Sequence, residues 1–201
     1  MDSITHLTNI LKNFPGLGIK SARRIVFHLL KKNQQELSDI ANAISTLKSN
    51  LHVCSICGNI SDKNPCYICS DPLRDKKTLC IIEDIESLTA LEQAGIYNGV
   101  YHVLGERVIP YKGEDLSKNS INFLLQHIQN SKPNEIIIAT NPLIEGDLTF
   151  YTIIETIRNS NFVPKKITRL AQGLPIGSSI EFTDRATLHT SFELRFPVDV
   201  K

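Results

Sequence analysis

The sequence predicts an α/β fold in which an N-terminal helical hairpin and a cysteine-rich knuckle precede a mostly parallel sheet flanked by helices. Three observations support this prediction. Apolar residues recur with helical spacing over residues 4–49, four cysteines cluster within residues 54–69, and short apolar runs alternate with helical patterns from residue 79 onward. Such alternation of strands and helices is typical of a parallel sheet with helices on its faces.

The composition is that of a globular protein. The chain has 201 residues, of which 41% are hydrophobic and 21% are charged, so it can form one large or two small domains. Its longest apolar runs, such as residues 79–82 and 136–139, are far shorter than the roughly 20 residues of a membrane-spanning helix. The N-terminus also lacks the basic start and apolar core of a secretory signal. We therefore expect a cytoplasmic protein with no membrane partner.

The charge is distributed unevenly along the chain. Residues 3–35 contain six basic and no acidic side chains, so with a formal net charge of +1 the rest of the chain carries −5. This asymmetry indicates a cationic module for a polyanion, attached to a mildly acidic body. A solvated helix face is the alternative, and charge alone does not separate the two.

The N-terminal helices fall at about residues 4–11, 20–30 and 34–49. The first two are joined by "PGLG", residues 15–18, whose glycines permit a tight turn and leave backbone N–H groups open to a phosphate. Lys20, Arg23 and Arg24 follow at i, i+3 and i+4, on one side of the second helix. This segment resembles a helix-hairpin-helix motif, which binds the nucleic-acid backbone without reading its sequence. A plain helical hairpin is the alternative.

The cysteines lie in "CSICGNISDKNPCYIC", where Cys54, Cys57, Cys66 and Cys69 form two pairs with two residues inside each pair. This spacing is typical of a tetrahedral zinc site, and four thiolates leave no coordination position open for catalysis. The sequence predicts one structural zinc per chain. Two disulfides or a redox-active pair are the alternatives, which a cytoplasmic chain disfavours. Cys80 lies in an apolar run and is expected in the core.

The second part of the chain follows the alternating pattern. The sequence predicts strands at residues 79–82, 99–104, 136–140 and 166–170, and helices at residues 85–94, 117–130, 148–159 and 185–195. In such sheets functional groups collect at the carboxyl ends of the strands.

Carboxylates follow two of these strands and could hold Mg²⁺. The region resembles the Toprim domain of topoisomerases, primases and some nucleases, whose catalytic members have a glutamate after the first strand and Asp-x-Asp after a later one. Glu83 matches the glutamate, but Asn141 and Leu143 occupy the two aspartate positions, while Glu145 and Asp147 are retained. An amide has no charge and a leucine cannot ligate a hard cation. The resemblance therefore implies a broken metal site and no catalytic residue.

The order of these parts resembles the RecR family of bacterial recombination mediators over nearly the whole chain. Matching segments include "FPGLGIKSARRIVFHLL", "LCIIED", "IIIATNPLIEGD" and "ITRLAQGLPIGSSIEFTD". The resemblance implies a helix-hairpin-helix region at residues 1–53, a zinc finger at 54–77, a Toprim domain at 78–172 and a C-terminal oligomerisation region at 173–201. One departure is the segment "VLGERVIPYKGEDL", which is shorter than the loop usual in the family.

The resemblance also implies what the protein does. Family members are non-enzymatic DNA clamps, ring-like homotetramers that act with RecO and RecF to help load RecA on gapped DNA. Lys20 and Arg24, with Arg23 beside them, would face single-stranded or duplex DNA regardless of sequence. The acidic cluster would dock a partner, RecO above all; its members are Glu83, Asp84, Glu145 and Asp147. The enzymatic alternative is a metal-dependent Toprim nuclease or primase that uses the same carboxylates.

Overall fold

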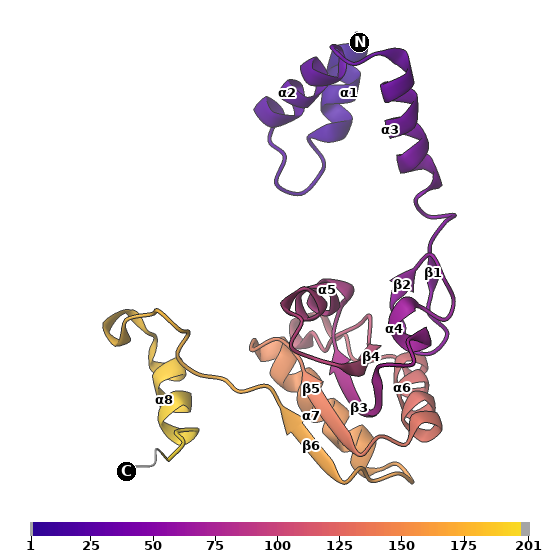
Figure 1. The fold of residues 1–201 in the computed structure, drawn as a ribbon. Coiled ribbons are helices and arrows are strands. Elements are labelled where there is room, and N and C mark those ends of the chain that lie inside the picture. Colours follow the sequence, from indigo (N-terminus) through magenta and orange to yellow (C-terminus); the bar gives the residue numbers. More distant parts are fainter. Residues whose placement is uncertain (1, 198–201) are drawn as a thin grey trace. The chain divides into compact units, whose positions relative to one another are not determined.

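The computed structural model describes residues 2–197 of the chain. The chain folds as two compact units, the first ending at Leu51 and the second beginning at His52 (Figure 1). The first unit corresponds to the cationic segment, and the second contains the cysteines and the strands. The predicted α/β class is confirmed, and each unit is described by itself below.

The first unit consists of α1 (Ser3–Leu11), α2 (Ile19–Leu29) and α3 (Gln34–Thr46). Helices α1 and α2 pack on each other through a small core that contains Thr8, Ala22 and Val26. Asn33 begins α3 with a capping box, in which its side chain accepts from the backbone N–H of Glu36 at 2.9 Å. Such a box satisfies two of the N–H groups that a helix start leaves open. None of the residues of α3 is buried.

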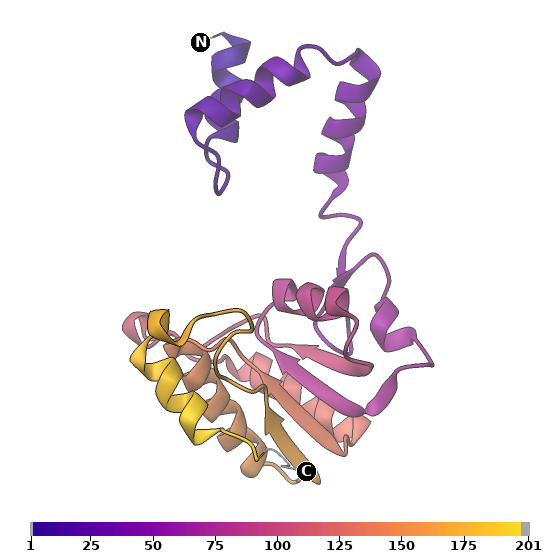
Figure 2. The same cartoon turned by 60° about the vertical axis from the view of Figure 1, so that its left-hand side comes forward.

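The second unit is built on a four-stranded parallel sheet in the order β4-β3-β5-β6. Its strands are β3 (Asp75–Ile82), β4 (Gly99–Val103), β5 (Glu135–Ala139) and β6 (Lys166–Arg169). The helices that follow these strands are α5 (Ile85–Ala94), α6 (Lys118–Ser131), α7 (Ile144–Arg158) and α8 (Arg185–Glu193). Figure 2 shows the strands running side by side with helices packed about them.

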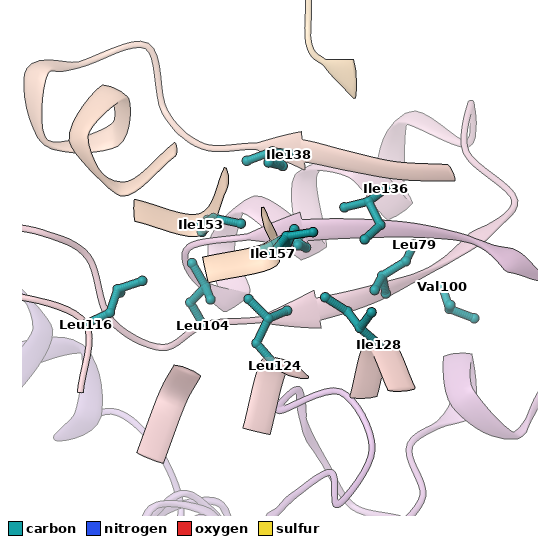
Figure 3. Close-up of a cluster of buried hydrophobic side chains, with 11 residues drawn as sticks. Leu79, Val100, Leu104, Leu116, Leu124, Ile128, Ile136, Ile138, Ile153 and Ile157 are labelled. Atoms are coloured by element: carbon teal, nitrogen blue, oxygen red, sulfur yellow. The ribbon is translucent and has the colours of Figure 1, made fainter. Parts of the chain in front are cut away.

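Alternating residues along the strands define two faces of the sheet. Leu79 and Ile81 of β3 belong to a cluster with Ile136 and Ile138 of β5. Helices α6 and α7 cover this face through Leu124, Ile128, Ile153 and Ile157, which Figure 3 shows around the strands. This alternation is the period of two expected of strands buried on both faces.

The opposite face of the sheet is covered by α5 and by the cysteine-rich knuckle. Cys80 and Ile82 of β3 pack there with Leu88 of α5 and with three of the four knuckle cysteines. Burial raises the pKa of the Cys80 thiol to about 12, so this thiol is inert, as expected of a core residue. The knuckle thus contributes part of the core of the second unit.

The largest differences between predicted and observed boundaries lie at the starts of two elements. Helix α7 begins at Ile144, not at residue 148, and β3 begins at Asp75, not at residue 79. In both cases most of the first residues are polar or glycine, so the apolar pattern starts later than the backbone conformation. The sequence pattern also missed several short elements: β1 (His52–Val53), β2 (Ile60–Ser61), α4 (Tyr67–Ser70), η1 (Pro110–Lys112) and η2 (Ile180–Phe182). These have too few residues to show a period.

The C-terminal arm, residues 170–197, follows β6 and contains η2 and α8. None of the residues of α8 is buried, and large apolar side chains of the arm are exposed, including Ile176, Phe182, Phe192 and Phe196. The predicted C-terminal region continues to residue 201, beyond the described residues. Within residues 2–197, no helix has the length and apolarity needed to cross a membrane.

Candidate functional site

The basic hairpin of the first unit exposes the residues predicted to bind nucleic acid. Gly16 has a φ of +74° in the turn that joins α1 to α2, a conformation that glycine adopts without strain. Gly18 begins α2 in extended conformation and offers no side chain to cap it. The first N–H groups of a helix have no intrahelical acceptor, so they point toward the turn and carry its positive end.

The three basic side chains of α2 are all exposed. Lys20 and Arg24 are one helical turn apart and lie on the same side of the helix. The guanidinium of Arg23 lies 5.8 Å from the centre of the Phe27 ring. Arg24 borders a shallow hollow together with His28, a residue that extends this surface by one more turn. The geometry is that of a cationic ridge, as the sequence predicts.

The four knuckle cysteines converge on one point. Their sulfur atoms lie within 4.8 Å of one another, and Cys57 Sγ is 3.6 Å from Cys66 Sγ. Sulfurs bound to one tetrahedral zinc at 2.3 Å would be about 3.8 Å apart. All five cysteines lie among the described residues, and all are free of disulfides. Among residues 2–197 these four form the only group of three or more metal-ligating side chains placed to share an ion.

Local structure explains why the knuckle forms where it does. The short strands β1 and β2, which lie on either side of the first cysteine pair, run antiparallel to each other, and the N–H of Cys66 points at Cys54 Sγ, 3.4 Å away. The knuckle is attached to the sheet because Val103 donates its N–H to the carbonyl of Cys57 at 2.7 Å. A Cβ on Gly58 would lie 2.7 Å from the Val103 carbonyl oxygen, so this contact requires glycine.

At the carboxyl ends of β3 and β5, where the carboxylates could hold Mg²⁺, Glu83 is hydrogen-bonded to Asn141. Glu83 is only 4% exposed. Its Oε2 accepts from the side-chain amide of Asn141 at 2.6 Å, and its Oε1 accepts from the backbone N–H of Asn141 at 3.3 Å. Asn141 therefore provides hydrogen-bond donors for a buried carboxylate. An aspartate at position 141 would repel this carboxylate. Leu143 is exposed and supplies no ligand.

Gly146, in the first turn of α7, packs directly against Asn141 and Glu83. A Cβ at this position would lie 2.0 Å from the Asn141 carbonyl oxygen and 3.0 Å from Glu83 Oε1. The glycine retained in "IEGD" thus has a packing role. We expect Gly146→Ala to lower the free energy of unfolding by about 3 kcal/mol, as overpacked sites do. Urea denaturation followed by circular dichroism measures this.

Gly173→Ala is the matched control for Gly146→Ala. Its new Cβ would meet only Ser191 Oγ, at 3.3 Å. This atom is the end of one side chain, which donates to the Thr187 carbonyl at 2.7 Å, so a shift of a few tenths of an ångström relieves the contact. We expect a change in unfolding free energy within about 0.5 kcal/mol for this variant. Equal stability of the Gly146→Ala protein and the unmodified protein would contradict the packing role of Gly146.

The other carboxylates of the predicted acidic surface do not converge with Glu83. Asp84 caps α5 by accepting from the N–H of Ser87 at 2.8 Å. Asp147 forms an ion pair with Arg169 of β6, whose guanidinium also lies over the ring of Phe150. Glu145 is half-buried and forms no ion pair among the described residues. These three lie near the surface, whereas Glu83 lies inside.

Two other acidic residues border the same edge of the sheet and were not among those predicted from the sequence. Glu86 and Glu106 line a hollow together with Glu83, Asp84 and Arg107. The sequence contained one indication that residues near Glu106 matter, since "GERVIPYKGED" differs from the loop that is usual in the family the chain resembles. Nothing in the sequence showed that this loop would lie beside the start of α5.

Comparison with known proteins places each of these parts. Residues 77–171 match the Toprim domain family. Family matches described as the RecR helix-hairpin-helix, the RecR four-cysteine zinc finger domain and the RecR C-terminal region cover residues 4–48, 51–71 and 173–195. The Recombination protein RecR of Koribacter versatilis (strain Ellin345) is 36% identical over 194 residues, which cover 96% of each chain. The zinc-finger match coincides with the converging cysteines, so the metal of this site is one structural zinc.

Proposed function

Because the chain belongs to the RecR family of recombination proteins, we propose that it is a ring-forming DNA clamp that mediates recombinational repair in the cytoplasm. The observation that carries this proposal is the exposed cationic ridge of Lys20, Arg23 and Arg24 beside an uncapped helix start. Backbone N–H groups and basic side chains bind phosphate and carry no base readout. The clamp therefore binds single-stranded and duplex DNA without sequence preference.

Assembly into a homotetramer is supported by apolar surface at both ends of the chain. Ile44 of α3 is 70% exposed and Phe182 of the C-terminal arm is 85% exposed, among several similar side chains. Large exposed apolar patches mark interaction surfaces in soluble proteins. We place one interface on α3 and its neighbours and the other on the C-terminal arm, and two different interfaces per chain suffice to close a ring.

The partners we propose are RecO and RecF, with which the clamp helps to load RecA on gapped DNA. The family membership supports this role, and the acidic edge of the sheet provides a surface for a basic partner. In this proposal Asp84, Glu145 and Asp147 contact the partner. Glu83 supports them from within, because its carboxylate is buried against Asn141.

We propose that the protein has no catalytic activity of its own. Asn141 already satisfies Glu83, and Leu143 offers no ligand, so the aspartate pair of the catalytic Toprim enzymes has no counterpart here. The second candidate is a metal-dependent nuclease or primase. Incubation of supercoiled plasmid with Mg²⁺ or Mn²⁺ separates the two, and nicking that is abolished by Glu83→Ala would reverse the proposal.

The solution mass tests the clamp. We expect a mass four times that of the chain by light scattering, either alone or after DNA is added. Ile44→Asp in α3 and Phe182→Asp in the arm should each yield smaller species, because each places a charge in a different apolar interface. Leu73→Asp, at a residue 83% exposed and outside both regions, is the control. A protein that stays monomeric under all these conditions is not a clamp.

A further inference from the structure

A groove in the second unit lies between the zinc-held hairpin and the start of α5. It has a volume of about 450 Å³ and is mainly apolar. Ligand pockets in proteins typically have volumes of about 300–1,000 Å³. Its apolar lining includes Val53 and Ile60 of the hairpin, Ile85 of α5, and Val103 and Phe123. None of these residues belongs to the cationic ridge or to the zinc shell.

Two exposed side chains of this groove lie on a hairpin that is anchored to the sheet. Val53 and Ile60 are cross-strand partners in the β1–β2 hairpin, and they are 64% and 44% exposed. Two β-branched apolar side chains thus stand in solvent on a hairpin whose position is set by the metal site and by the bond from Val103 to Cys57. A preorganised apolar surface binds with a smaller loss of conformational entropy than a mobile one.

The rim of the groove is acidic. Asp84 and Glu86 border it, and together with Gly105 they also border a second hollow of about 270 Å³. Glu106 adds another carboxylate to that hollow, in which Arg107 is the one basic residue among those that the structure describes. The two hollows share three residues and therefore form one continuous surface, apolar at one end and anionic at the other.

We infer that this groove, bounded by Val53, Ile60 and Glu86, binds a partner protein through a segment in which large apolar side chains are flanked by lysine or arginine. The apolar side chains bury themselves against the hairpin and Phe123, and the basic groups lie over the carboxylates. Charge complementarity of this kind favours a basic segment and disfavours the phosphates of DNA. The inference rests on the proposed mediator function, and it extends the partner contact proposed at Asp84 to the knuckle side of the sheet edge.

A synthetic peptide in which leucines are flanked by lysines serves as the probe. Methyl resonances report directly on the groove, because Val53, Ile60, Ile85 and Val103 all carry methyl groups. We expect these resonances of the full zinc-loaded chain to shift on titration with the peptide. Replacing the lysines of the peptide by glutamate, or its leucines by alanine, should weaken binding roughly tenfold or more in each case.

Variants of the protein test whether the peptide binds in this groove. Ile60→Ser and Glu86→Lys should each weaken peptide binding about tenfold, the first through lost apolar contact and the second through charge repulsion. The matched controls are Ile96→Ser and Glu155→Lys, both at exposed positions outside the groove, and these should bind the peptide as the unmodified protein does.

Several outcomes would overturn the inference. The first is that the glutamate peptide binds as tightly as the lysine peptide, and the second is that the peptide shifts methyl resonances of the first unit only. The third is that duplex DNA shifts the methyl resonances of the groove. The fourth is that Ile60→Ser changes the solution mass, which would mean that a second copy of the chain occupies the groove. DNA binding that depends on Lys20 and Arg24 is measured separately. If it persists while the peptide fails to bind, only the groove assignment is wrong.

Discussion

Removal of zinc is expected to unfold the knuckle first and to lower the melting temperature of the whole second unit. Structural zinc sites contribute an apparent binding free energy on the order of 10 kcal/mol or more, and the folding of the segment depends on it. The knuckle around Cys54 and Cys66 has only two short strands and one short helix to hold it, so little structure would remain without the metal.

The effect should extend beyond the knuckle because three of its cysteines are part of a larger core. Cys54, Cys57 and Cys66 pack in one cluster with Ile82 and Tyr101 of the sheet. When the metal leaves, four thiols must share this space, and the sheet loses the cover on one face. We therefore expect a lower melting temperature in a strong chelator, measured by circular dichroism, and one released zinc per chain in a colorimetric assay.

Cysteine variants separate the metal effect from simple loss of packing. Cys66→Ser should fail to retain zinc and should melt as the chelated protein does, because an alcohol is a poor ligand in a thiolate site. Cys80→Ser changes a cysteine that is similarly buried but lies outside the metal-binding group, so it should keep its zinc. If the melting curve is unchanged by the chelator, the metal does not hold the fold.

The zinc site could be predicted in full from the sequence because its geometry is local. Two residues between thiolates direct both sulfurs toward one ion, and no other part of the chain is needed for the inference. The sheet was predictable for a related reason, since strands buried on both faces, such as residues 136–139, read as continuous apolar runs. Both are cases in which a short pattern determines the structure that it forms.

The acidic edge shows where sequence reasoning stops. Glu83 and Asp84 are adjacent in the chain, yet one is buried against Asn141 and the other caps a helix. Which carboxylate faces solvent depends on the order of the strands and on where α7 packs against them. The spacing of the residues in the sequence predicts neither. The groove beside Ile60 was not predicted for the same reason, because its lining comes from four segments that are far apart in the sequence.

Reversal of charge on the cationic ridge is expected to abolish most DNA binding. In Lys20→Glu plus Arg24→Glu, two basic groups that lie one turn apart become acidic, on the side of α2 next to its uncapped start. Each lost phosphate contact removes one counterion-release contribution, and each new carboxylate repels the backbone. We expect the affinity for duplex and single-stranded oligonucleotides at low salt to fall on the order of a hundredfold, measured by fluorescence anisotropy.

The salt dependence distinguishes loss of specific contacts from a general effect of net charge. If Lys20 and Arg24 each contact a phosphate of duplex DNA, the slope of log affinity against log salt should become shallower by about two. Lys112→Glu plus Lys118→Glu changes the net charge by the same amount at two exposed lysines of the second unit. This control should retain both the slope and most of the affinity. Equal losses in the two double variants would mean that overall charge, and not the ridge, attracts DNA.

Arg23 is expected to have a smaller effect than its two neighbours, which tests the orientation of the ridge. Its guanidinium already lies over the Phe27 ring, and a cation in this position must give up part of that attraction to reach a phosphate. Arg23→Ala should therefore weaken DNA binding less than Arg24→Ala in the same titration. A larger loss for Arg23→Ala would mean that the DNA approaches α2 from the side of Phe27, and that the face of Lys20 and Arg24 is not the centre of the interface.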